Sequence, residues 1–443
     1  MRRVKLLQKT YSGLRKGLLI FSILGAFLFI AVGPGSLSLE RAPWVIAMYG
    51  GWDNTQFGLF PSDLWGQSRK MLARIARLAP PSVPFVLLYD GLAPGDSELI
   101  DLRKNESLVD NGEVIDATTH EVNYGDPKTL SRFIIWMNKT YPAKHFLLGF
   151  GHHYGWQGFN TDESSPGPRG MDIITMPEYR GAMTVARDAG VRVDIQWFEA
   201  CSCTMIETLY EYAAFSTYVV GNEDTIDFFD MAVRFPRALR AIGASPEMPP
   251  EDVAKILVNT YPLHTPSIVI NQIMPFQYTI NPRSPSLKGG LGFRKWSPTQ
   301  FAVDCRRIPE LARAVADLAA YIMGNVSAHR GAALKAARTA QKYTLMPWYV
   351  DLYDWADRLE NLSPDPAIKE RCRKIKTFVN SAVFASAKLD SDTRRHGILI
   401  IFPQNGAKWR VEKKNEFDTS NTYSDLNFAK DTHWDELMDA LFE

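Results

Sequence analysis

Residues 194–204 read DIQWFEACSCT, a stretch in which a cysteine stands where a strand gives way to a helix. The mostly apolar run 195–198 predicts a short buried strand, and the spacing of apolar residues over 205–215 predicts a helix. Open α/β sheets bind ligands beyond the carboxyl ends of their strands, and the positive end of a helix dipole favours a reactive thiolate. The alternative is a core cysteine, because free cysteine is among the most buried residue types. This stretch alone supports both interpretations.

Around this stretch, apolar runs alternate with helical patterns. Further strands are predicted at 44–49, 83–89, 145–150 and 218–221, and helices at 67–78, 127–141 and 177–189. Residues 92–125 predict an irregular segment with a small hairpin, and the Gly-, Pro- and Ser-rich residues 157–175 predict a loop. The alternation indicates an α/β fold with a mostly parallel sheet flanked by helices on both faces.

The second half of the sequence is more helical. Helices are predicted at 228–242, 250–261, 308–323, 331–341 and 434–442, with one late strand at 397–402. Prolines near 245–265 mark either a domain boundary or a loop within one large unit. With 443 residues, the chain suits one large α/β domain with additions, or two domains.

The N-terminus differs in composition from the rest of the chain. Residues 1–16 carry several basic residues and no acid, and residues 17–32 are apolar and uncharged. This order is typical of an export signal or membrane anchor. We favour an uncleaved anchor, because residues 33–43 lack a clean small-x-small cleavage site. Either way the positive-inside rule predicts that the chain after about residue 35 lies outside the cytoplasmic membrane.

Composition excludes several classes of protein. The net charge of +1 gives no global field that would attract nucleic acid, so no nucleic-acid partner is predicted. The four cysteines (Cys201, Cys203, Cys305 and Cys372) are too few for a disulfide scaffold. Cys305 and Cys372 could pair only in an oxidising compartment.

Polar residues follow three of the predicted strands. Asp53 and Asn54 follow the first, His152 and His153 the third, and the turn with Cys201 the fourth. A histidine and a cysteine from separate strand ends suit nucleophilic catalysis, with the imidazole as base for the thiol. Backbone N–H groups beside the histidine could stabilise an oxyanion.

Two other interpretations use the same side chains. Two imidazoles and two thiolates are the right ligands for tetrahedral zinc. However, adjacent residues at a strand end point to opposite sides, as His152 and His153 would, and the C-x-C spacing of Cys201 and Cys203 is tighter than usual. We therefore predict no metal ligands here. The other interpretation is a set of buried structural side chains. Glu207 is predicted to be a surface or capping residue of its helix.

Two longer segments resemble a known family. Residues 121–156, EVNYGDPKTLSRFIIWMNKTYPAKHFLLGFGHHYGW, resemble the segment around the catalytic histidine of clostripain-like cysteine peptidases. Residues 197–225, WFEACSCTMIETLYEYAAFSTYVVGNEDT, resemble the nucleophile segment of that family. Looser matches continue in order to residue 437. The resemblance implies a fold of the caspase–gingipain–legumain type.

The resemblance also implies roles for residues. His152 and Cys201 would form the catalytic dyad, and the backbone N–H of His153 would stabilise the oxyanion by a hydrogen bond. Glu199 would lie in the S1 pocket and favour Arg or Lys at P1, since an acid at the base of a pocket suits a cation. Arg169, in the predicted loop 157–175, would be the site of activating cleavage.

Two further acids follow the strand predicted at 218–221. Asp227 and Asp230 are candidates to add negative charge to S1, although ordinary loop and N-cap roles suit them as well.

The resemblance implies that no cofactor is required, and calcium assists some members of the family. Proteins or peptides would be the substrates, and the N-terminal segment would contact the membrane. We divide the chain into 1–40 (signal or anchor), 41–260 (catalytic core) and 261–443 (C-terminal part of the same peptidase unit).

Three departures from the family pattern lie at the predicted site. His153 replaces a glycine, Glu199 replaces an aspartate, and Ser202–Cys203 replaces a Leu-Met-like pair. They leave an alternative function: a catalytically inert, membrane-tethered binding or scaffold protein on a peptidase fold.

Overall fold

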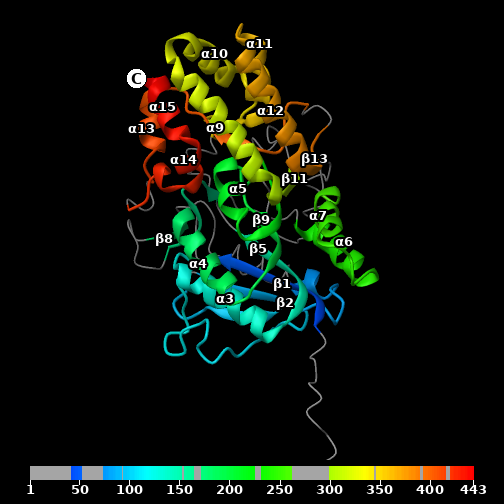
Figure 1. The fold of residues 1–443 in the computed structure, drawn as a ribbon. Helices are drawn as coiled ribbons and strands as arrows, with labels where there is room; N and C mark the ends of the chain where they lie inside the picture. Colours follow the sequence, from blue (N-terminus) through cyan, green and yellow to red (C-terminus); the bar gives the residue numbers. More distant parts are fainter. Residues whose placement is uncertain are drawn as a thin grey trace, which may run out of the picture. The chain divides into compact units, whose positions relative to one another are not determined.

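A mixed sheet runs through the described part of the chain in the order β13-β11-β10-β9-β5-β1-β2-β3-β4 (Figure 1). The computed structural model describes residues 41–51, 73–91, 93–151, 154–163, 171–224, 231–261, 299–343, 346–389, 393–415 and 420–443. The strands of this sheet are β1 (Ala42–Gly51), β2 (Phe85–Asp90), β3 (Glu98–Asp101), β4 (Glu106–Ser107), β5 (Ala143–Gly151), β9 (Val193–Glu199), β10 (Ser216–Gly221), β11 (Gln300–Asp304) and β13 (Val383–Ala387).

The centre of the sheet is parallel and its edges are antiparallel. Strands β2, β1, β5, β9 and β10 pair in parallel. At one edge β3 and β4 add the small hairpin predicted within 92–125, and at the other β11 and β13 also pair antiparallel. The parallel strands are buried on both faces and are therefore nearly continuously apolar, which is why their runs stand out in the sequence.

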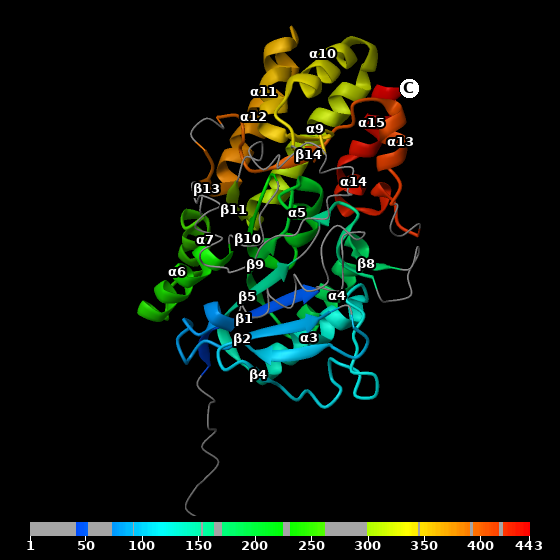
Figure 2. The ribbon, with the colours of Figure 1, turned by 180° about the vertical axis from the view of Figure 1, so that it is seen from behind.

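Side chains alternate between the two faces of the sheet, and each face has its own apolar core. In β1, Val45, Ala47 and Tyr49 lie in one core, and Trp44, Ile46 and Met48 in the other. The first core is covered by α3 (Pro127–Thr140), α4 (Met176–Asp188), α5 (Ile206–Tyr212) and α9 (Ile308–Gly324). The second is covered by residues 73–76, α6 (Met231–Ala244) and α7 (Pro250–Asn259) (Figure 2). The predicted α/β class, with helices on both faces, is confirmed.

Helices α3 and α4 begin where their sequences predict. The Asp126 side chain accepts from the Lys128 N–H at 2.8 Å and Pro127 occupies the first turn. Thr175 and Glu178 form a capping box that starts α4. These caps fix the residue at which each of the two helices begins.

The C-terminal half is mainly helical, as predicted. The described residues there form, besides α9, the helices α10 (Val326–Thr339), α11 (Leu352–Leu362), α12 (Pro366–Ala382), α13 (Gly406–Glu412), α14 (Asn427–Thr432) and α15 (Trp434–Phe442). The late strand appears as β14 (Leu399–Ile401), which pairs with β12 (Tyr349–Asp351) and not with the main sheet. The sequence analysis does not predict strands β11, β12 and β13 or helices α11, α12, α13 and α14.

The loop prediction for residues 157–175 is wrong for most of its described part. Strands β7 (Gly158–Asp162) and β8 (Asp172–Thr175) form a three-stranded sheet with β6 (Tyr154–Gly155). Every residue of β7 is buried, so tertiary packing overrides the turn-forming preference of its Gly, Asn and Asp residues.

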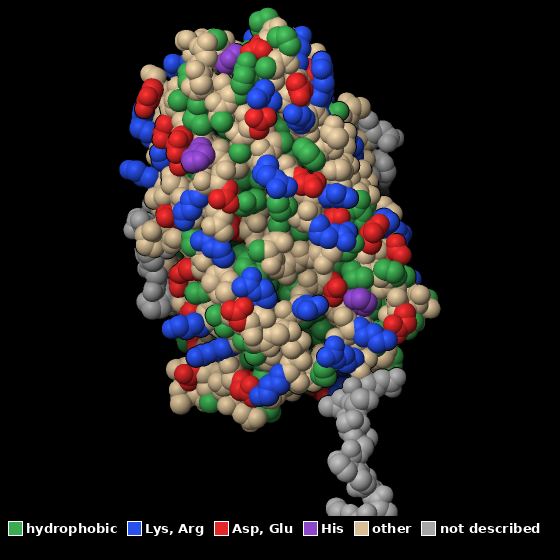
Figure 3. All heavy atoms as spheres, viewed as in Figure 1, with side chains coloured by type: hydrophobic (Ala, Val, Ile, Leu, Met, Phe, Trp, Pro, Cys, Tyr) green, Lys and Arg blue, Asp and Glu red, His purple; other side chains and the backbone are tan. Residues whose placement is uncertain are grey.

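The predicted signal or anchor at 1–40 lies outside the described residues and stays a prediction, as does the start of the helix predicted at 67–78. Within the described ranges, no helix combines the length and apolar character that crossing a bilayer requires. All four cysteines, Cys305 and Cys372 included, are free thiols. On the face drawn in Figure 3, basic and acidic side chains of the described residues are interspersed.

Candidate active site

The strands that carry the predicted catalytic residues lie side by side. Strand β5 ends at Gly151 and β9 at Glu199, and these two residues are partners in the parallel register. Neighbouring strands are about 4.8 Å apart. Cys201 therefore comes two residues after a strand end whose neighbour, Gly151, immediately precedes His152 in the sequence.

Several predicted site residues are not described. His152, His153, Arg169, Asp227 and Asp230 all lie outside the described residues, so their roles stay predictions. Asp53 and Asn54 do so as well. Of the predicted set, Glu199, Cys201 and Cys203 can be described.

Cys201 occupies a tight turn between β9 and α5. Its side chain is partly exposed and packs against the apolar core of the α5 face. The next residue, Ser202, has a φ of 48°, in the left-handed region that non-glycine residues rarely adopt. Such backbone persists only when its surroundings hold it, and it occurs often at functional sites.

Cys203 is more deeply buried than Cys201. It is fully buried, and its Sγ lies 3.2 Å from the Ala200 carbonyl oxygen and accepts from the Asn222 N–H at 3.2 Å. Burial raises the pKa of the Cys203 thiol to about 12. Cys203 is therefore a packed, protonated thiol that holds the turn, and Cys201 is the accessible one.

Residues 222–224, which follow β10, also hold the turn through hydrogen bonds. Asn222 donates its side-chain N–H to the Ala200 oxygen at 3.1 Å, and its own carbonyl accepts from the Thr204 N–H at 3.2 Å. The Asp224 carbonyl accepts from the Ser202 N–H at 3.3 Å. No local sequence pattern predicts this role, because these bonds link residues that follow two different strands.

Buried acidic and basic side chains hold the same segment to the C-terminal half. Asp224 forms a buried ion pair with Arg395. Burial and the nearby Asp351 carboxylate raise the pKa of Glu223 well above its usual range. Asp351, whose pKa burial raises to about 6, accepts from the His396 N–H at 2.6 Å. Residues 222–224 are therefore tied to strand β12 and to the chain just before β14.

Glu199 is buried, with only 3% of its surface exposed. By the alternation of side chains along β9, it shares the face of Trp197, on the side covered by α6 and α7. Phe198 lies on the opposite face and stacks on Phe150 of β5 with ring centroids 5.0 Å apart. This aromatic contact holds the two strand ends together beneath the turn.

Glu207 is not the surface or capping residue that the sequence predicts. It is fully buried in α5, and its Oε1 accepts from the Ile401 N–H at 2.8 Å and from the Tyr423 hydroxyl at 3.0 Å. Burial raises the pKa of Glu207 to about 7. It anchors the helix behind Cys201 to β14, and no local pattern could have predicted partners about 200 residues away.

Glu207→Gln is expected to stabilise the protein at alkaline pH. Gln keeps the accepting oxygen but cannot ionise. Since folding raises the pKa of Glu207 from 4.5 to about 7, the wild type binds this proton more tightly when folded and loses stability as pH rises through 7. The stability difference between variant and wild type should grow by about 3 kcal/mol from pH 4 to pH 8. Urea unfolding at several pH values measures it.

Glu436→Gln, on the exposed surface of α15, is the control and should track the wild type at every pH. A pH-independent difference between Glu207→Gln and the wild type would contradict a buried, titrating Glu207.

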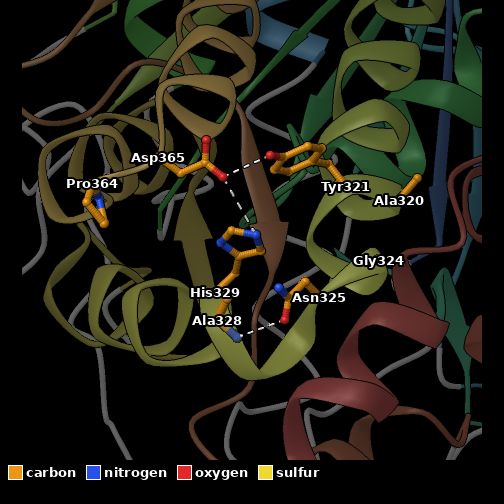
Figure 4. A pocket seen from close by; sticks show the side chains of 8 residues that line it. All are labelled: Ala320, Tyr321, Gly324, Asn325, Ala328, His329, Pro364 and Asp365. Carbon is orange, nitrogen blue, oxygen red and sulfur yellow. Dashed lines mark hydrogen bonds and ion pairs between the residues drawn. The ribbon is translucent and has the colours of Figure 1, made fainter.

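A cavity of about 670 Å³ lies among the C-terminal helices, where α9, α10 and the start of α12 meet (Figure 4). The Tyr321 hydroxyl donates to Asp365 at 2.9 Å, and His329 lies 3.8 Å from the same carboxylate. Its lining contains no cysteine or serine, so it offers no nucleophile beside its histidine.

Comparisons with known proteins agree with this geometry. The sequence profile of the clostripain family matches residues 79–440. A secreted C11 cysteine protease from Bacteroides thetaiotaomicron, solved with an irreversible peptide inhibitor, has a similar structure: TM-score 0.58, 16% identity, covering 89% of this chain and 99% of the other. An inactive zymogen of a C11 protease from Parabacteroides distasonis gives a TM-score of 0.57 at 15% identity over 89% and 99% of the two chains.

A further secreted C11 protease from Bacteroides thetaiotaomicron, iotapain, gives a TM-score of 0.52 at 11% identity over 89% and 100% of the two chains. A comparison with curated proteins found no match. At these identities the solved structures support the fold alone, whereas the profile spans most of the sequence. The chain therefore belongs to the clostripain family of cysteine peptidases.

Proposed function

We propose that this protein is an exported endopeptidase that cleaves after Arg or Lys with a His152–Cys201 dyad. The observation that carries the proposal is the contrast between the two thiols of the turn. Cys201 is partly exposed beside the strand end that precedes His152, whereas Cys203 is buried and hydrogen-bonded.

The proposed reaction follows from these groups. The His152 imidazole takes the proton of the Cys201 thiol, and the thiolate attacks the scissile carbonyl carbon. The resulting oxyanion accepts a hydrogen bond from the backbone N–H of His153. The imidazolium then gives its proton to the leaving amine as the C–N bond breaks, and water hydrolyses the thioester to release the acid and the free thiol.

Glu199 supplies the proposed preference for a basic P1 side chain. It lies two residues before Cys201 and is almost fully buried, so its carboxylate acts through a medium of low dielectric. Strand β10 pairs with β9, and Asp227 and Asp230 follow β10 in the sequence. We propose these two acids as further members of S1.

Export and activation are the remaining parts of the proposal. The basic and apolar residues 1–40 would direct the chain across, or anchor it in, the cytoplasmic membrane, with the catalytic part outside. Two of the similar structures are secreted proteases and another is a zymogen. Cleavage at Arg169, between the described strands β7 and β8, is the proposed activation step.

We also propose that 41–260 and 261–443 work as one peptidase unit. The Thr204 carbonyl, in the turn of Cys201, accepts from the Leu399 N–H at 3.0 Å, and Met205 forms a bridge to the same residue. Removing the C-terminal half would therefore remove hydrogen bonds from the turn itself.

Labelling by a peptidyl electrophile with Lys at P1 tests the function. We expect one covalent adduct per chain, on Cys201, located by mass spectrometry of the peptides. Cys203, Cys305 and Cys372 should stay unmodified, because burial raises the pKa of each thiol to about 12.

The same electrophile with Asp at P1 is the matched control and should react at least about ten-fold more slowly. Iodoacetamide on the denatured chain should modify all four cysteines. Absence of any Lys-directed adduct on the folded chain would favour the inert scaffold, and an adduct on another cysteine would overturn the assignment of Cys201.

A further inference from the structure

Arg395 lies in the C-terminal half of the chain, yet its side chain reaches the segment that holds the turn of Cys201. It forms a buried ion pair with Asp224, and the side chains of the two residues are 4% and 0% exposed. The backbone carbonyl of Asp224 accepts from the Ser202 N–H at 3.3 Å. A single residue, Asp224, therefore links the Arg395 guanidinium to the backbone next to Cys201.

The hydrogen bond from Asp224 supports the most constrained residue of the turn. Ser202 has a φ of 48°, and residues other than glycine keep this conformation only where their surroundings hold it. Because Ser202 directly follows Cys201 in the chain, a change in its backbone would displace the Cys201 sulfur relative to the end of β5. A displacement of about 1 Å can lower the rate of an enzyme about 100-fold.

A buried guanidinium needs a negative partner, and Asp224 supplies it. Loss of one member of a buried ion pair leaves the other charge buried and uncompensated. Glu223 does not balance the guanidinium, because burial and then the Asp351 carboxylate raise the pKa of Glu223 well above its usual range and keep it protonated near neutral pH. Without Arg395, the Asp224 carboxylate would turn toward water and draw its own carbonyl away from Ser202.

The two neighbours of Arg395 in the chain fix its backbone against α11. Arg394 donates to the Asp354 carboxylate at 2.6 Å, and the His396 N–H donates to the Asp351 carboxylate at 2.6 Å. Asp351 is the N-cap of α11, and Asp354 lies in its first turn. Arg395 is therefore held on both sides while its side chain extends to Asp224.

We propose that Arg395 is a positioning residue for the Cys201 nucleophile and acts through its ion pair with Asp224. The inference rests on the proposed role of Cys201, and it gives a residue outside the predicted catalytic core 41–260 a part in peptide hydrolysis. The adjacent Arg394 bonds to Asp354 and to the Thr339 carbonyl. In the described part of the chain, Arg394 has no bond to the turn.

Steady-state kinetics of Arg395→Gln with a fluorogenic Lys-P1 peptide test the proposal. We expect kcat to fall at least about ten-fold and KM to stay within about two-fold of the wild-type value, because a displaced nucleophile slows the chemical step more than it weakens substrate binding. The melting temperature of each sample shows that the protein is folded at the assay temperature.

Arg395→Lys should recover kcat to within about three-fold of the wild type. Arg395 bonds to Asp224 through Nη2, and its Nε and Nη1 have no hydrogen-bond partner among the described residues. One ammonium group beside Asp224 can therefore replace the guanidinium. This recovery would show that the charge, and not the shape of the side chain, holds the turn.

Arg394→Gln is the matched control, since it makes the same change at the adjacent residue. It breaks the ion pair with Asp354 and should lower the melting temperature, yet kcat should stay within about two-fold of the wild type. A purely structural role for Arg395 would give Arg395→Gln the same pattern.

Hydrogen exchange of the backbone amides of residues 200–204, followed by mass spectrometry, reports on the turn without a substrate. These amides should exchange at least about ten-fold faster in Arg395→Gln and at the wild-type rate in Arg394→Gln. If Arg395→Gln does not fold, the double variant Asp224→Asn/Arg395→Gln replaces it, because it leaves no charge buried and unpaired. Its amide pair is weaker than an ion pair, so kcat should fall and exchange should rise at least about three-fold.

The possible results separate this inference from the proposed function. A wild type that hydrolyses no peptide would overturn the proposed function, and hydrogen exchange would then decide by itself whether Arg395 holds the turn. The positioning role is overturned if either kcat or the exchange rate of Arg395→Gln, or of the double variant in its place, equals that of Arg394→Gln.

Discussion

Cys201→Ala should lower kcat/KM for a peptide with Lys or Arg at P1 by at least about 10⁴-fold, the loss expected when a peptidase loses its nucleophile. The change removes one sulfur from a partly exposed side chain, so the fold should survive it. The hydrogen bonds of Ala200, Ser202 and Cys203 that hold the turn should remain in this variant. Initial rates with a fluorogenic peptide, beside a thermal melt of the same sample, measure both effects.

The matched control is Cys203→Ser, two residues away. A hydroxyl can donate to the Ala200 carbonyl and accept from the Asn222 N–H, as the Cys203 thiol does now. We expect this variant to keep activity within about ten-fold of the wild type, at the modest cost in stability usual for a core substitution. Activity that survives Cys201→Ala but is lost in Cys203→Ser would reverse the assignment of the two thiols.

The strands that form the site were predictable because their apolar runs are long enough to stand alone. The predicted runs 145–150 and 195–198 lie within β5 and β9, and the prolines of α3 and α4 mark the helix starts. Parallel strands buried on both faces need such runs, so this signal is local. The alternation predicts a parallel sheet, whereas the pairing of Gly151 with Glu199 is seen only in the structure.

The supporting residues of the site were not predictable in this way. Glu207 stands in a helix where a charged residue indicates a surface, yet its partners are Ile401 and Tyr423. Asn222 donates from its side chain and its backbone to residues about 20 positions away, and no local sequence pattern marks such bonds. The Gly, Asn and Asp residues of β7 favour turns and therefore predict a loop, and only the complete burial of this segment explains why it is a strand. In each case the deciding contact is distant in sequence.

Glu199→Gln should remove most of the preference for a basic P1 residue without unfolding the protein. Gln has the same shape and keeps one accepting oxygen but carries no charge. Only 3% of the Glu199 surface is exposed, so the carboxylate acts in a medium of low dielectric. In the variant the substrate cation would lose this counter-charge. We expect kcat/KM for Lys and Arg substrates to fall at least about 100-fold, with little change for a neutral P1 residue.

Glu199→Asp is the control that separates charge from shape, because it keeps the carboxylate on an arm one methylene shorter. It should keep the basic preference and alter the ratio of Lys to Arg cleavage, since the two cations differ in reach and geometry. Kinetics with a panel that varies only P1 measures all three proteins. If Glu199→Gln kept the wild-type ratio of basic to neutral cleavage, the negative charge in S1 would have to come from Asp227 or Asp230. Glu199 would then have only a structural role at the end of β9.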